Sequence, residues 1–192
     1  MATDFDFRKR AVRGLTAQIG VYVLCDLDGV PIYVGQSKAG IRSRVARHLT
    51  SARSDIIANR QIDVWEIAYV WTYPEPDRLQ IGLLEARLFH HFNPKSQLMN
   101  GTQPAFLDDG IPVPTPLQRV QVMSDAEIVS KKDPTQRLPR QADHYAQIVG
   151  HFVAVKNSTQ VARAMNAHFE RLRKYHAGLL GIAEPDEDAP EE

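Results

Sequence analysis

The chain has 192 residues, of which 43% are hydrophobic and 24% charged, and these proportions are typical of a globular protein and not of a disordered chain. Eleven glycines and a single cysteine, Cys25, exclude a collagen-like repeat and a disulfide scaffold, and no apolar run in the sequence is as long as a membrane span. The lone cysteine and a charged N-terminal stretch, which lacks the apolar centre of a signal peptide, predict a cytoplasmic protein.

The net charge of zero conceals an uneven distribution of charge along the chain. The last ten residues contain six acids and no bases, and without them 23 basic residues face 17 acidic ones. Residues 36–60 contain six bases and one acid. Such a basic cluster suits a polyanionic partner, but a solvated helix face has the same composition.

The first hundred residues predict one compact module with the element order β-β-α-β-α. The predicted elements are strands over 19–25 and 30–36 around an Asp28-Gly29 turn, a helix over 40–53, a strand over 62–72 and a helix over 77–92. Asn93-Pro94 ends the last helix. The sequence therefore predicts an α+β fold, in which a three-stranded antiparallel sheet is flanked by helices and followed by a C-terminal helical region.

The second half of the chain shows weaker patterns, and we divide it into three parts. Residues 102–140 are predicted as a wrapping linker with a short strand at Arg119–Met123 and a capping box from Ser124 to Glu127. Residues 141–182 are predicted as a helical accessory region with helices over 142–154, over 159–165 and on to about 180. This spacing is typical of a helix-turn-helix, and equally of a plain helical cap or a dimer contact. Residues 183–192 are predicted as a disordered acidic tail.

The predicted hairpin permits a geometric test of its two faces. A two-residue loop at Asp28-Gly29 makes Tyr22 face Gly35 and Leu24 face Tyr33. Strand alternation then places both tyrosines on one face of the sheet, beside glycines that leave space above it. The opposite face carries only core residues.

Three polar residues fall on or beside the apolar faces of the predicted helices. Arg44 and His48 are four residues apart and share one edge of the packed face of their helix; each has an ordinary alternative, an arginine that extends to solvent and a histidine that packs. Glu85 lies in the middle of an apolar stripe, where a carboxylate needs a partner. That partner is either a metal ion or an arginine such as Arg44.

These residues together resemble the GIY-YIG nuclease superfamily. Gly20-Val21-Tyr22 and Tyr33-Val34-Gly35 are similar to its paired signature, with valine at both middle positions. The stretch from Gln36 through Arg44 to His48 resembles the motif of its first helix. Glu85 stands where the family has its metal-binding glutamate, and Asn100 resembles its closing asparagine. The likeness covers residues 18–101, so residues 1–101 are interpreted as a GIY-YIG-like nuclease domain.

The resemblance implies hydrolysis of a DNA phosphodiester with one divalent metal ion, Mg²⁺ or a similar cation such as Mn²⁺. Glu85 would bind the metal, and Arg44 would hold the phosphate. Tyr22 would orient or deprotonate the attacking water, Tyr33 would help to align it, and His48 would bond Tyr22 or relay its proton. Asn100 would hold the site together; its alternative is a polar loop residue. The basic residues expected at the DNA are Lys38, Arg42, Arg47 and Arg53.

The sequence leaves the biological setting open. A restriction, phage or mobile-element role suits a small nuclease, and RNA stays open as the substrate. One active site cuts one strand at a time, so a double-strand break requires a homodimer or two visits. A non-catalytic nucleic-acid-binding module on the same fold is the main alternative, and a structural or regulatory protein that uses the acidic tail is another.

Overall fold

The structure of the protein is a computed structural model that describes residues 4–50, 62–106, 110–155 and 158–182. Arg53 and the predicted acidic tail lie outside the described residues. The elements are, in chain order, α1 (Phe5–Arg13), β1 (Gly20–Cys25), β2 (Pro31–Ser37), α2 (Ile41–Thr50), the 3₁₀ turn η1 (Val64–Glu66), β3 (Tyr69–Pro74), α4 (Ile81–Phe92), β4 (Gln118–Gln121), α5 (Asp125–Lys132), α6 (Pro134–Ala154) and α7 (Thr159–Leu180).

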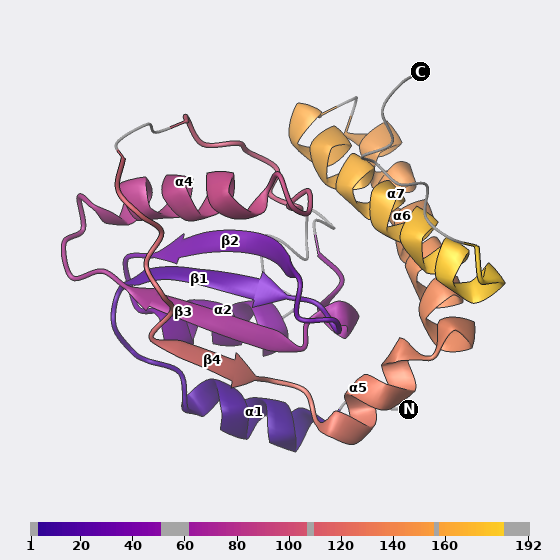
Figure 1. Ribbon diagram of the computed structural model, residues 1–192, viewed down its shortest axis with the longest axis horizontal. Coiled ribbons are helices and arrows are strands. Elements are labelled where there is room, and N and C mark those ends of the chain that lie inside the picture. The colour runs from indigo at the N-terminus through magenta and orange to yellow at the C-terminus, as the bar shows by residue number, and fades with distance from the viewer. Residues whose placement is uncertain (1–3, 51–61, 107–109, 156–157, 183–192) are drawn as a thin grey trace.

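A single antiparallel sheet with the strand order β2-β1-β3-β4 forms the centre of the molecule (Figure 1). The predicted α+β class is confirmed, but the sheet has four strands and not three. The fourth strand is β4, which pairs with β3 from Tyr69 opposite Gln121 to Thr72 opposite Gln118. Most of β4 lies within the short strand predicted at Arg119–Met123. Its partner could not be predicted, because the local sequence of four residues does not show which other strand they pair with. The strand β2 forms the free edge at the other side of the sheet.

The register of the first hairpin is confirmed over the residues that matter for the site. Tyr22 lies opposite Gly35 and Leu24 opposite Tyr33, as predicted. The prediction of a two-residue loop is wrong, because the strand pairing shifts at a bulge after Leu24. The loop is longer since the Asp26 carboxylate accepts hydrogen bonds from the backbone N–H groups of Asp28 and Val30, at 2.9 Å each.

The helices α2 and α4 cover opposite faces of the sheet (Figure 1). Residues of α2 pack in one core cluster with Tyr22 and Leu24, while residues of α4 pack in another with Val21 and Val23. This division follows from strand alternation, because neighbouring residues of β1 point to different faces. Any site that uses side chains from both helices must therefore lie at an edge of the sheet.

The predicted third strand begins seven residues later than expected. Residues 62–72 are rich in β-branched and aromatic side chains, but Asp63 caps a 3₁₀ turn by accepting a hydrogen bond from the Trp65 N–H at 3.1 Å. This turn points the carboxylate of Glu66 toward the C-terminal helices. The pairing with β1 starts only at Tyr69.

The C-terminal region contains two long helices where three short ones were predicted. The helix α7 runs without interruption through residue 165, so the predicted third helix is its continuation. It lies beside α6 at one end of the sheet (Figure 1). Residues 102–140 contain β4, α5 and the first turns of α6; the division of the chain into domains stays a prediction. None of the helices in the described part of the chain is long and apolar enough to span a membrane.

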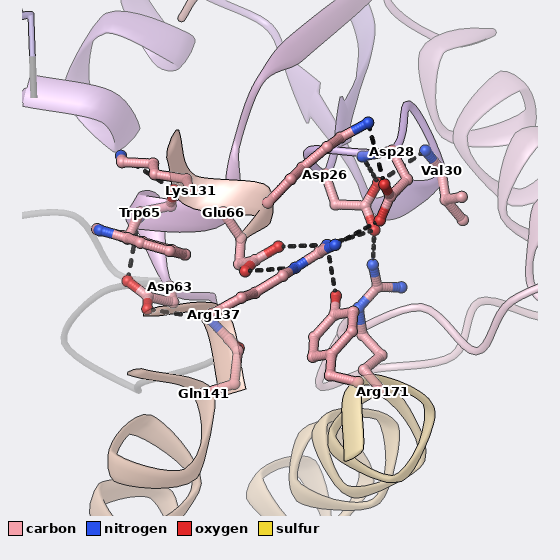
Figure 2. Close-up of polar contacts among 12 residues, drawn as sticks. Asp26, Asp28, Val30, Asp63, Trp65, Glu66, Lys131, Arg137, Gln141 and Arg171 are labelled. Atoms are coloured by element: carbon pink, nitrogen blue, oxygen red, sulfur yellow. Dashed lines mark hydrogen bonds and ion pairs between the residues drawn. The ribbon is translucent and has the colours of Figure 1, made fainter. Parts of the chain in front are cut away.

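A buried ionic network joins these helices to the hairpin loop (Figure 2). Arg137 of α6 binds both carboxylate oxygens of Glu66, at 3.1 and 2.9 Å, and one oxygen of Asp28, at 2.7 Å. Arg171 of α7 forms an ion pair with Asp26. Because these arginines and carboxylates come from opposite sides of the interface, their charges hold the helical pair against the sheet.

Candidate active site

Two tyrosines and a histidine meet on the α2 face of the sheet. The Tyr22 hydroxyl and His48 Nε2 are 2.7 Å apart, which is a short hydrogen bond. The Tyr33 ring centroid is 6.3 Å from that of Tyr22 and 6.3 Å from that of His48. Tyr22 and His48 are fully buried, while Tyr33 is partly exposed. Solvent therefore reaches this group through Tyr33 first.

Two glycines of the sequence motif are required by close packing. A Cβ added at Gly35 would lie 2.5 Å from the Tyr22 hydroxyl oxygen, so the Tyr22 phenol fills the space above this glycine. Gly20 has a φ of 146° and its added Cβ would collide with the Tyr73 carbonyl of β3. Both positions therefore exclude any side chain.

The cations expected from the sequence lie along α2 and its entry. Lys38, Arg42 and Arg47 are exposed, as a role at a polyanion requires. Arg42 also donates from Nε to the Leu15 carbonyl at 2.6 Å, which fixes its guanidinium against the preceding loop. Arg44 is half-buried on α2, one turn before His48.

Glu85 reaches the free edge of the sheet from the α4 face. Its Oε2 accepts a hydrogen bond of 2.7 Å from Nε2 of Gln36 in β2. Burial raises the pKa of the Glu85 carboxyl, while hydrogen bonds from Gln36 and the charge of Lys38 lower it, and the net direction is upward. The partner in this contact is a neutral amide, which was not considered from the sequence. The amide carries no positive charge, and Lys38 supplies one nearby.

Asn100 binds the same edge strand through its side-chain amide. Its Oδ1 accepts from the Val34 N–H at 3.1 Å, and its Nδ2 donates to the Val34 carbonyl at 2.6 Å. Val34 lies between Tyr33 and Gly35 in β2. Asn100 thus fixes the strand that carries both, which is the geometry expected of a residue that holds the site.

The structure brings the predicted residues together in two groups. Tyr22, Tyr33 and His48 lie under α2, and Glu85 and Asn100 lie along β2. The strand β2 joins the groups, because its successive residues alternate between them. The contact of Gln36 with Glu85 and the contact of Arg163 in α7 with the Asn100 carbonyl were not predicted from sequence, since a glutamine and a distant arginine carry no local signal of such a role.

Among the described residues, no group of three or more histidine, cysteine, aspartate or glutamate side chains is arranged to hold a metal ion. The single carboxylate of Glu85 still fits Mg²⁺, because this ion keeps several waters and is commonly held by one or two carboxylates together with substrate phosphates. The donor set does not fit an ion that needs a full cage of protein ligands, such as structural zinc.

Comparison with known protein families supports the interpretation of the first hundred residues. Residues 18–100 match the family model described as the GIY-YIG catalytic domain. No curated protein and no solved structure matches the chain. The matched segment begins just before β1 and ends at Asn100, so it contains every residue of the two groups. Residues 18–100 of this chain are a GIY-YIG catalytic domain, a phosphodiester-hydrolysing nuclease domain whose substrate is a nucleic acid.

Proposed function

We propose that the chain is a metal-dependent endonuclease that hydrolyses phosphodiester bonds in DNA. The observation that carries this proposal is the buried hydrogen bond between Tyr22 and His48 beside Tyr33, at a sheet edge where Glu85 also lies. A tyrosine held at 2.7 Å from an imidazole has a partner that can take its proton. The half-buried carboxylate of Glu85 across the strand supplies a hard oxygen ligand.

The chemistry assigned to each residue follows from its surroundings. His48 accepts the phenolic proton of Tyr22, and the Tyr22 oxygen then accepts a proton from water. The water oxygen attacks phosphorus while the bond from phosphorus to the leaving sugar oxygen breaks, and the leaving oxygen takes a proton from solvent. Tyr33, which solvent reaches, aligns that water or the phosphate. Arg44 binds the non-bridging phosphate oxygens as a charged hydrogen-bond donor. Glu85 holds Mg²⁺, or a similar cation such as Mn²⁺.

When bound, the metal ion supplies Lewis-acid stabilisation of the charge on the phosphate and on the leaving oxygen. Lys38, Arg42 and Arg47 are exposed and belong to one basic stretch, so they suit contacts to the phosphate backbone that are independent of sequence. The same side chains would also suit the phosphates of RNA, and we propose DNA as the substrate. A homodimer, and a restriction, phage or mobile-element setting, are part of the same proposal.

Cleavage of supercoiled plasmid and of linear DNA with and without Mg²⁺ tests the proposal. We expect products only with the metal, and loss of cleavage in Glu85→Gln, which keeps the side-chain volume and removes the anionic ligand. DNA binding of that variant should persist or rise, because a negative charge has left the site. Glu75→Gln is a matched control, because Glu75 is half-buried like Glu85 and lies outside the proposed site. DNA binding without cleavage would favour the non-catalytic module, and metal-dependent cleavage by Glu85→Gln would contradict the metal assignment.

A further inference from the structure

The helix α7 contacts the loop from Asn93 to Asn100 with three polar side chains. Asn166 donates to Gln97 Oε1 at 2.8 Å, and Arg171 donates to Ser96 Oγ at 3.3 Å. The third is Arg163. This loop connects α4, which carries Glu85, to the residue that binds the edge strand. A helix outside the catalytic domain therefore lies against a segment that shapes the site.

Arg163 joins the two ends of this loop. Its Nε donates to the Asn100 carbonyl at 3.1 Å, and its Nη2 donates to Asn93 Oδ1 at 2.5 Å. Its guanidinium carbon also lies 5.2 Å from the centroid of the Phe89 ring in α4. A planar guanidinium with fixed donors suits such a double contact better than a lysine ammonium does.

The contacts continue from Arg163 into the catalytic strand. The backbone of Asn100 binds Arg163, and the side chain of Asn100 binds both backbone polar groups of Val34. Val34 is flanked by Tyr33, which faces the site, and by Gly35, over which the Tyr22 phenol packs. A displacement of Asn100 would therefore shift the strand that sets the spacing of the two tyrosines.

We propose that Arg163 is a positioning residue for the nuclease site, which it supports by holding Asn100 against β2. Residues 159–180 then act as a scaffold of the catalytic domain rather than as a separate DNA reader. This inference rests on the proposed function for its effect on cleavage. Its structural part concerns only the backbone of Val34 and is measured independently of cleavage.

The test compares Arg163→Met with a matched control on the same helix. Methionine keeps an unbranched apolar side chain and removes every donor, together with the guanidinium beside Phe89. Arg173→Met is the control, because Arg173 is exposed and pairs with Glu170 of its own helix. Amide hydrogen exchange should accelerate at Val34 in Arg163→Met, by about tenfold or more, with the amides of β1 unchanged.

Kinetic measurements on the full chain separate positioning from stability. In Arg163→Met we expect kcat to fall on the order of ten- to a hundredfold, with KM little changed, since a small misplacement of reacting groups has an effect of this size. Arg163→Lys should recover part of kcat, because one ammonium can reach one of the two acceptors. In the Asn100→Ala background, Arg163→Met should lower kcat no further.

The exchange and kinetic measurements together decide the role of Arg163. Unchanged Val34 exchange in both Arg163→Met and Arg163→Lys overturns the inference, whether or not the protein cuts DNA. Faster Val34 exchange with an unchanged kcat also overturns it, because the loop would then be held without consequence for the site. If the parent protein does not cleave DNA while Val34 exchange accelerates, the proposed function fails and the contact from Arg163 to β2 stands.

Discussion

The largest loss of stability is expected from Arg137→Met, at the centre of the interface between the C-terminal helices and the hairpin loop. Methionine keeps the unbranched stem and removes all the hydrogen-bond donors. The Glu66 carboxylate, only 4% exposed, then keeps its charge without the guanidinium that binds both its oxygens. Tyr175 loses its hydrogen bond and a guanidinium 3.9 Å from its ring centroid.

The magnitude follows from the burial of the pair. Removing one partner of a buried ion pair costs about 3–5 kcal/mol of the free energy of unfolding. The loss of the ion pair between Arg137 and Asp28 adds little to this cost, because Asp28 is partly exposed. For a chain of this size each kcal/mol moves Tm by roughly 2–4 °C. Thermal unfolding followed by circular dichroism should therefore show a Tm lower by roughly 6–20 °C. The double variant Arg137→Met/Glu66→Gln removes the stranded charge and should recover most of this loss.

The pH dependence of the stability of Arg137→Met gives an independent check on the role of the Glu66 charge. Burial raises the pKa of the Glu66 carboxyl and Arg137 lowers it, with a net upward direction. Without Arg137 that pKa rises further. A carboxyl whose pKa is higher in the folded state destabilises the protein as pH rises above its unfolded value, and this cost disappears at lower pH. The deficit of Arg137→Met should therefore shrink as pH falls toward about 4. A loss below about 1 kcal/mol, or a double variant as unstable as the single one, would refute the reasoning.

Three further variants test the catalytic domain. Gly35→Ala should lower cleavage by about tenfold or more, because its Cβ displaces the Tyr22 hydroxyl; normal rates with an unchanged Tm would contradict this. Tyr22→Phe should lower single-turnover cleavage by roughly a hundredfold or more if the phenol moves a proton, and a larger effect of Tyr33→Phe would transfer that role to Tyr33. Glu85→Gln should leave Tm unchanged or raise it at about pH 7, since burial raises the pKa of Glu85; any gain should vanish near about pH 4, and a lower Tm would indicate a structural role.

Sequence patterns predicted the hairpin well because its information is local. Alternating apolar residues on both strands fix which side chains share a face, so the order of residues alone places Tyr22 and Tyr33 together. The bulge after Leu24 could not be foreseen, because it follows from the Asp26 side chain binding the loop backbone. That aspartate is held in turn by Arg171, at a distance of 145 residues in sequence.

The parts that were missed depend on contacts between distant segments. Glu85 was recognised as a carboxylate in need of a partner, but its partner Gln36 lies on another element. The uninterrupted course of α7 is another case, since a serine at residue 158 and generic helical spacing are compatible with several helix boundaries. The helix α1 was overlooked despite a local signal, because Asp4 caps it by accepting from the Phe7 N–H at 2.9 Å.

The amide of Asn100 has a further consequence for how copies of this chain can associate. An edge strand exposes unpaired backbone groups to which another chain can add a strand. At β2 these groups are occupied, because Val34 is paired with the Asn100 side chain and the Ile32 carbonyl accepts from the Met99 N–H at 2.8 Å. A second molecule cannot extend the sheet here without breaking these bonds. Self-association, including any dimer that cuts both strands, must therefore use a part of the surface other than β2, and Asn100→Ala would open a route to aggregation at this edge as well as weaken the site.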